Sequence, residues 1–98
     1  MKTYSIDPYV IDVLMPDLVG HDRSPAAFVV YLSLYCASER RRNASVPISL
    51  QEIATQTGLA KSTIQVAIRH LKRRHLLDPA VVASTTKPAR RVAKPWAR

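Results

Sequence analysis

The side chains best suited to recognise another molecule lie between residues 61 and 74, on one side of a predicted helix. At about 100° per residue, this side collects hydrogen-bonding and cationic groups and contains no acid, which is unusual for a face that only meets water. Such groups can bond to base edges and to phosphate oxygens. The members of this face are Ser62, Gln65, Val66, Arg69 and Arg73, with Thr63 and His70 at its edge. The opposite, apolar stripe consists of Ile64, Ala67, Ile68 and Leu71.

A shorter helix ahead of this one is predicted to hold it in place. Ser49 and Glu52 have the spacing of a capping box, and an apolar face follows from Leu50 to Thr57. Gly58 can adopt the positive φ that ends such a helix. Because only Gly58, Leu59 and Ala60 join the two helices, they must cross steeply. The pattern therefore predicts a helix-turn-helix over residues 49–75.

The run EIATQTGLAKSTIQVAIRHLKRRHLL, residues 52–77, resembles the helix-turn-helix of GntR-type and MarR-type winged-helix regulators. The family pattern is E-[LI]-A, a Gly-[LV] corner, S-T-[VI], then A-[LI]-x-x-L-x-x-x-x-L-[LI]. The resemblance covers about a third of the chain. His75 departs from it, because the family usually has a glycine where the second helix ends. The chain has neither the large effector domain of GntR proteins nor the long dimerisation helices of MarR proteins, so ligand sensing is not carried over and no small-molecule effector is evident.

The resemblance implies sequence-selective binding of double-stranded DNA, typical of a transcriptional regulator, with helix 61–75 in the major groove. The expected fold is mainly α (α+β): a three-helix core with a C-terminal β-hairpin wing and an extra short N-terminal helix. We expect one domain over residues 1–98. Its parts are an N-terminal extension (1–23), a helical core (24–77) and the wing (78–96).

Three groups of residues are assigned to this interface. Gln pairs bidentately with adenine and Arg with guanine, and a helix N-terminus attracts phosphate. The base-reading group is Ser62, Thr63, Gln65, Val66 and Arg69. The phosphate group is Ser49, Gln51, Lys61, Arg73 and Arg74. The wing group is Thr85, Thr86, Lys87, Arg90 and Arg91.

The other elements follow from start signals and apolar runs. Asp7-Pro8 starts a short helix to about Met15, which Pro16 ends or kinks before a linker from Asp17 to Arg23. The helix from Ala26 to about Arg41 is apolar nearly all round and is predicted to be the central core helix. A short strand at 46–48 and a hairpin of strands 80–83 and 90–96 complete the fold. Trp96 is expected to pack back on the domain.

Charge is distributed very unevenly along the chain. Residues 61–98 contain ten Lys/Arg and one acid, a balance of +9, whereas residues 1–60 contain five bases and six acids, a balance of −1. This favours a polyanion partner for the second half. A membrane surface is disfavoured because the basic helix has no aromatic insertion face. We expect no signal peptide, because aspartates interrupt the apolar runs near the N-terminus. We expect a cytoplasmic, nucleoid-associated protein, and a single cysteine is compatible with that compartment.

No arrangement of residues predicts an enzyme, a cofactor or a metal site. His70 and His75 are five apart, about 140° around a helix, so they cannot share one ion. One such domain contacts few base pairs, so a homodimer is expected, with the apolar residues of the N-terminal helix as its candidate interface. Two alternatives stay open. The first is the DNA-binding module of a plasmid or phage replication initiator, and the second is a winged helix that contacts protein in a larger assembly.

Overall fold

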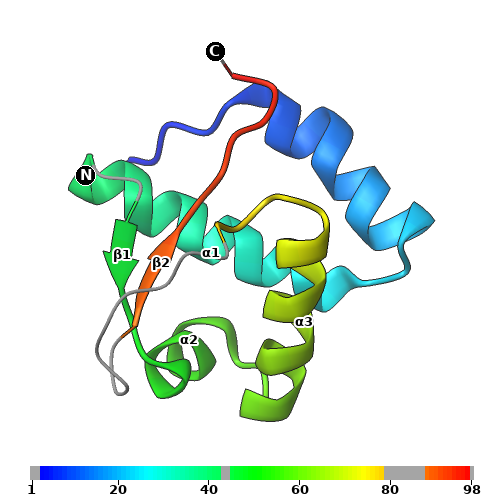
Figure 1. Cartoon of the computed structure of the whole chain (residues 1–98). Helices are drawn as coiled ribbons and strands as arrows, with labels where there is room; N and C mark the ends of the chain where they lie inside the picture. The colour runs from blue at the N-terminus through cyan, green and yellow to red at the C-terminus, as the bar shows by residue number, and fades with distance from the viewer. Residues whose placement is uncertain (1–2, 43–44, 79–87, 98) are drawn as a thin grey trace.

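The computed structural model describes residues 3–42, 45–78 and 88–97 of a mainly helical protein with a small two-stranded antiparallel sheet. Helix α1 (Pro25–Arg41) runs through the middle, and the other elements pack around it (Figure 1). The remaining elements are η1 (Val10–Leu14), η2 (Asp17–His21), β1 (Ser45–Pro47), α2 (Leu50–Thr57), α3 (Lys61–Arg73) and β2 (Ala89–Arg91). No helix within the described ranges is long and apolar enough to cross a membrane.

Helix α1 is the core helix that its apolar circumference predicted, and its bounds agree with the expected 26–41 within one residue. Pro25 occupies its first turn, where the missing N–H costs nothing. The Ser24 side chain makes no capping hydrogen bond, so the proline alone marks this start. The buried side chains of α1 are Ala27, Phe28, Val30, Tyr31, Leu34, Tyr35 and Ser38.

The N-terminal segment departs from the prediction, because the linker expected from Asp17 to Arg23 is largely helical. Two π-helical turns, η1 and η2, follow one another, and Pro16 lies at the start of the second, where no N–H is needed. The driving force is burial at a four-residue spacing: Val10, Leu14 and Leu18 are almost completely buried. Val13, on the same segment, is exposed. The segment covers one side of α1.

The corner between α2 and α3 forms as predicted. The Glu52 N–H donates to Ser49 Oγ over 3.1 Å, and the Ser49 N–H donates to the Glu52 carboxylate over 3.3 Å, which completes the capping box. Helix α2 ends at Gly58, whose φ of 80° is the left-handed conformation that favours glycine.

Helix α3 ends two residues before the predicted position 75. The Leu76 N–H donates to the Leu71 carbonyl over 2.9 Å, and the His75 N–H donates to the Lys72 carbonyl over 3.1 Å. This pair of bonds is the Schellman motif, and His75 takes its left-handed position with a φ of 59°. A histidine therefore occupies the position at which the resembled family has glycine.

Replacing His75 with glycine should raise the free energy of unfolding by about 1 kcal/mol, because a non-glycine residue pays roughly that much to adopt a positive φ. Urea denaturation followed by circular dichroism measures the change. His75→Ala is the matched control and should give no gain, since alanine has the same backbone strain. A loss of stability in His75→Gly would show that the histidine side chain makes a contact worth more than the strain.

The sheet pairs the segment between α1 and α2 with the C-terminal segment of the chain. Strand β1 pairs antiparallel with β2, with Val46 opposite Arg90, and an isolated bridge links Leu77 to Val92. The second wing strand was predicted to reach Trp96 but is shorter, because residues 94–97 form a turn around Pro95. The first wing strand, 80–83, lies outside the described residues. Trp96 packs back as expected, stacked on Tyr9 with ring centroids 4.6 Å apart.

Candidate functional site

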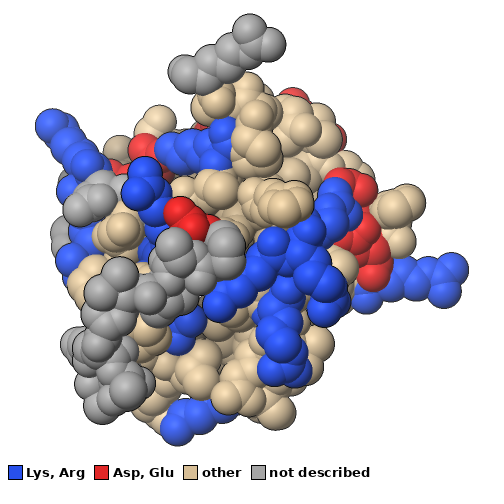
Figure 2. Space-filling view, in the orientation of Figure 1, with Lys and Arg blue, Asp and Glu red and all other residues tan. Residues whose placement is uncertain are grey.

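The outward face of α3 is the face predicted to recognise a partner. Its apolar stripe is buried against α1 and α2, which fixes the helix so that the opposite side faces outward. Exposed on that side are Ser62, Gln65, Val66, Arg69 and Arg73, while Thr63 is half-buried. Lys and Arg side chains gather over this part of the molecule (Figure 2). The structure thus brings the five base-reading candidates together on and beside one face.

The side chains of two residues on this face have no polar partner in the molecule. Within the described ranges, no hydrogen bond or ion pair involves the side chain of Gln65 or of Arg69, which lie one helical turn apart. Val66 lies between them in sequence and is the most exposed large apolar side chain in the same ranges, at 56%. A free amide, a free guanidinium and a bare isopropyl group can together meet polar base edges and a methyl group.

The phosphate candidates divide into exposed residues and residues with structural partners. Gln51 in α2 and Lys61 and Arg73 at the two ends of α3 are exposed, and Arg73 Nη2 lies 3.4 Å from His70 Nδ1. The hydroxyl of Ser49 already accepts the Glu52 N–H in the capping box, so its first role is to start α2. Arg74 also has structural partners.

Arg74 lies in an ion-pair cluster with the N-terminal segment. Its guanidinium bonds to the carboxylates of both Asp17 and Asp22, and His70 Nε2 lies 2.7 Å from Asp22 Oδ2. We call the group of Asp17, His21, Asp22, His70 and Arg74 the aspartate cluster. Arg74 is therefore better explained as a brace between α3 and the N-terminal segment than as a phosphate contact.

The aspartate cluster perturbs Asp22. The hydrogen bond with His21, together with the bonds from His70 and Arg74 and the charge of Arg74, outweighs burial and lowers the pKa of Asp22 from 3.8 to about 2. Because the folded-state pKa is the lower one, the stabilisation is complete above about pH 4 and disappears as the pH falls toward 2.

Asp22→Asn should lower the free energy of unfolding by about 1–3 kcal/mol at pH 7, because it leaves the half-buried Arg74 and His70 with one carboxylate fewer. Urea denaturation between pH 2 and 7 measures both this loss and its pH dependence. The difference in free energy of unfolding between the wild type and Asp22→Asn should disappear as the pH falls toward 2. Asp12→Asn in dilute solution is the control, since Asp12 is exposed and makes no bond within the described residues. A pH-independent difference would contradict the assignment.

Three ligand-type residues of the aspartate cluster also come close together. One ligand atom each from Asp17, His21 and Asp22 lies within 4.8 Å of the others, an arrangement that sequence reasoning missed. The Arg74 guanidinium binds both carboxylates and offsets one of their two negative charges. The geometry thus supports an ion-pair brace between α3 and the N-terminal segment.

The wing candidates are only partly described. Thr85, Thr86 and Lys87 lie outside the described residues. Arg90 is half-buried and its Nε donates to the Ile48 carbonyl over 3.2 Å, and burial lowers the pKa of its guanidinium. Arg90 thus has a structural bond on the sheet, which the sequence-based assignment to the interface did not include. Arg91, on the same strand, is exposed.

No family model matches the chain, and neither the curated proteins nor the solved structures contain a match to it. The α3 face and its surroundings therefore provide the observations that bear on function.

Proposed function

We propose that the chain binds double-stranded DNA sequence-selectively, as a winged helix-turn-helix regulator with α3 in the major groove. The observation that carries the proposal is the acid-free, exposed face of α3, on which Gln65 and Arg69 are free of partners within the described residues. The major groove, about 12 Å wide, admits a helix. The short α2–α3 corner at Gly58 is typical of the motif that presents a second helix in this way.

Each side chain of the face has a role that matches its chemistry. Gln65 reads adenine through two hydrogen bonds, and Arg69 reads the O6 and N7 acceptors of guanine. Val66 contacts a thymine methyl. Ser62 and Thr63, in the first turn of α3, bond to a base edge or to a phosphate at the positive end of the helix dipole.

The sheet supports the winged arrangement. Strand β1 lies between α1 and α2 in the chain and pairs with β2, as the strand ahead of a helix-turn-helix does when it pairs with a wing. Arg91 of β2 is exposed and available to a phosphate. In this proposal, Thr85, Thr86 and Lys87 would contact the DNA backbone beside the groove that α3 reads.

A salt titration of DNA binding tests the proposal. Of the six cations assigned to phosphates or to the wing, Arg74 is held by two aspartates. The other five are Lys61, Arg73, Lys87, Arg90 and Arg91. If about five phosphates are neutralised, log affinity should fall with log salt at a slope of about −4 to −5. Arg91→Ala should make the slope shallower by about one, while Arg90→Ala, which removes a half-buried arginine, should change it less. A slope near zero would contradict the proposal.

We also propose that two copies bind together. One domain reads few base pairs, so two copies on a two-fold symmetric site would supply the affinity and specificity that one copy lacks. Analytical ultracentrifugation of the chain, alone and with a selected DNA site, should show two copies on the site. Single copies under both conditions would contradict this part of the proposal.

A further inference from the structure

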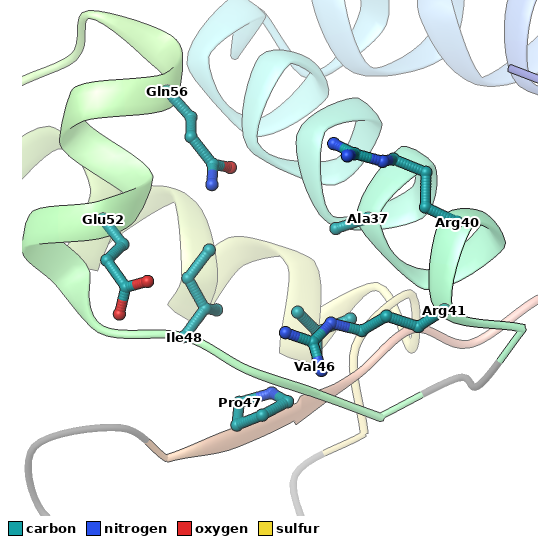
Figure 3. A pocket seen from close by; sticks show the side chains of 8 residues that line it. All are labelled: Ala37, Arg40, Arg41, Val46, Pro47, Ile48, Glu52 and Gln56. Atoms are coloured by element: carbon teal, nitrogen blue, oxygen red, sulfur yellow. The ribbon is translucent and has the colours of Figure 1, made fainter. Parts of the chain in front are cut away.

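A groove lies along α1 from Val29, in its second turn, to its last turn. It consists of three hollows of about 360, 520 and 270 Å³, and Arg40 lines all three. In the first of them, Arg40 and Arg41 extend from α1 and Gln56 extends from α2 into the same space (Figure 3). We call this the α1 groove and define it by Val29, Leu32, Ser33, Cys36, Ala37, Arg40 and Arg41.

The α1 groove has an apolar end and a cationic end. Val29, Leu32 and Cys36 line the apolar end, and Val29 is 38% exposed. At the other end, neither Arg40 nor Arg41 has an ion-pair partner within the described residues, although Arg40 lies 5.9 Å from the centre of the Tyr4 ring.

The two acids beside the cationic end already have partners. Glu39 bonds to Lys94 Nζ over 2.5 Å, and Glu52 accepts the N–H of Ser49. The positive charge of Arg40 and Arg41 therefore stays largely uncompensated by their neighbours, and an apolar partner segment that carries an acid would complement the groove.

The N-terminal segment of the same chain has these properties. Residues 3–22 contain four aspartates and neither lysine nor arginine. Asp7, Asp17 and Asp22 bond within the molecule, whereas Asp12 is exposed and has no partner among the described residues. The outer side of the segment also exposes four large apolar side chains. These are Ile11, Val13, Met15 and Val19.

We propose that the N-terminal segment of one copy docks in the α1 groove of a second copy. Ile11, Met15 and Val19 follow a four-residue spacing along η1 and η2 and would cover the apolar end of the groove. Asp12 would pair with Arg40 or Arg41. This inference deepens the proposed two-copy arrangement, on which it rests, by naming both halves of the contact. Since each copy carries a net charge of +8, a specific acid–base pair is needed to offset general repulsion.

Charge reversal tests the docking directly. Sedimentation equilibrium without DNA should show reversible dimers of the wild type at micromolar to submillimolar concentration. Asp12→Arg, and Arg40→Glu with Arg41→Glu, should each weaken self-association at least roughly tenfold, because like charges then meet. A mixture of these two proteins should associate again, since both contacts between the two variants then pair opposite charges. Arg23→Glu reverses one charge outside the groove, half the charge change of the double variant, and should leave association unchanged.

Two results would overturn this docking. One is a wild type that stays monomeric up to submillimolar concentration, and the other is a mixture of the reversed variants that fails to associate although each is folded by circular dichroism. If Arg40→Glu with Arg41→Glu weakened only DNA binding, the groove would be a DNA contact and the docking would be wrong. The salt slope and the effect of Arg69 on DNA do not depend on this contact, so the two proposals can fail separately.

Discussion

Replacing Gln65 and Arg69 together with alanine should lower affinity for a selected DNA site by on the order of 10² to 10⁴-fold. Each bidentate contact to a base discriminates by about 1–3 kcal/mol, and two of them give this range if the losses are roughly additive. Affinity for random DNA should fall much less, because glutamine carries no charge and Arg69 is one cation among several.

Fluorescence anisotropy with selected and random duplexes measures both losses at one salt concentration. The control replaces Thr55 and Arg23 with alanine, which removes one polar and one cationic side chain from exposed positions outside both α3 and the α1 groove. This control should retain the preference for the selected site. If the Gln65/Arg69 variant lost affinity equally for both duplexes, the two residues would supply only general attraction and would not read bases.

Leu71→Ala should lower the free energy of unfolding by about 3–5 kcal/mol, the largest stability effect that we expect. Leu71 is fully buried on the inner side of α3, which packs against α1 and α2, and truncation of such a leucine removes apolar contacts and leaves a cavity. Small domains are stable by only about 5–15 kcal/mol in total, so this variant should be partly unfolded at physiological temperature.

Val66→Ala is the matched control for Leu71→Ala, because it trims an apolar side chain on the opposite, exposed side of the same helix. Its stability should change by less than about 0.5 kcal/mol, with alanine's helix propensity offsetting the small loss of contacts. Thermal and urea denaturation compare the two. If both variants lost a similar free energy of unfolding, the assignment of the Leu71 side of α3 as buried and the Val66 side as exposed would be wrong.

The helices with strong local signals could be predicted from sequence almost to the residue. The capping box at Ser49 and the glycine at 58 each act within a few residues, and they set the ends of α2 as expected. The same holds for Pro25 at the start of α1. The outward face of α3 could be predicted from periodicity alone. Four apolar residues lie on one side of the helix, so that side is the one expected to be buried.

Features that depend on distant residues could not be predicted in this way. Arg74 was assigned to phosphate because it is a cation at a helix end, but its partners Asp17 and Asp22 lie more than 50 residues away. The helical conformation of η2 was missed because Pro16 and Gly20 are local helix breakers. Burial of Leu18 against the rest of the molecule overrides them, and only the tertiary fold contains that information.

Selection of bound duplexes from a random DNA pool by the wild-type chain, followed by sequencing, is the sharpest test of base reading by α3. We expect an enriched site of a few base pairs with a guanine at one position, and Arg69→Ala should lose the preference at that position alone. A pool that remains random after repeated selection, or an enriched site that Arg69→Ala reads unchanged, would contradict base reading by α3.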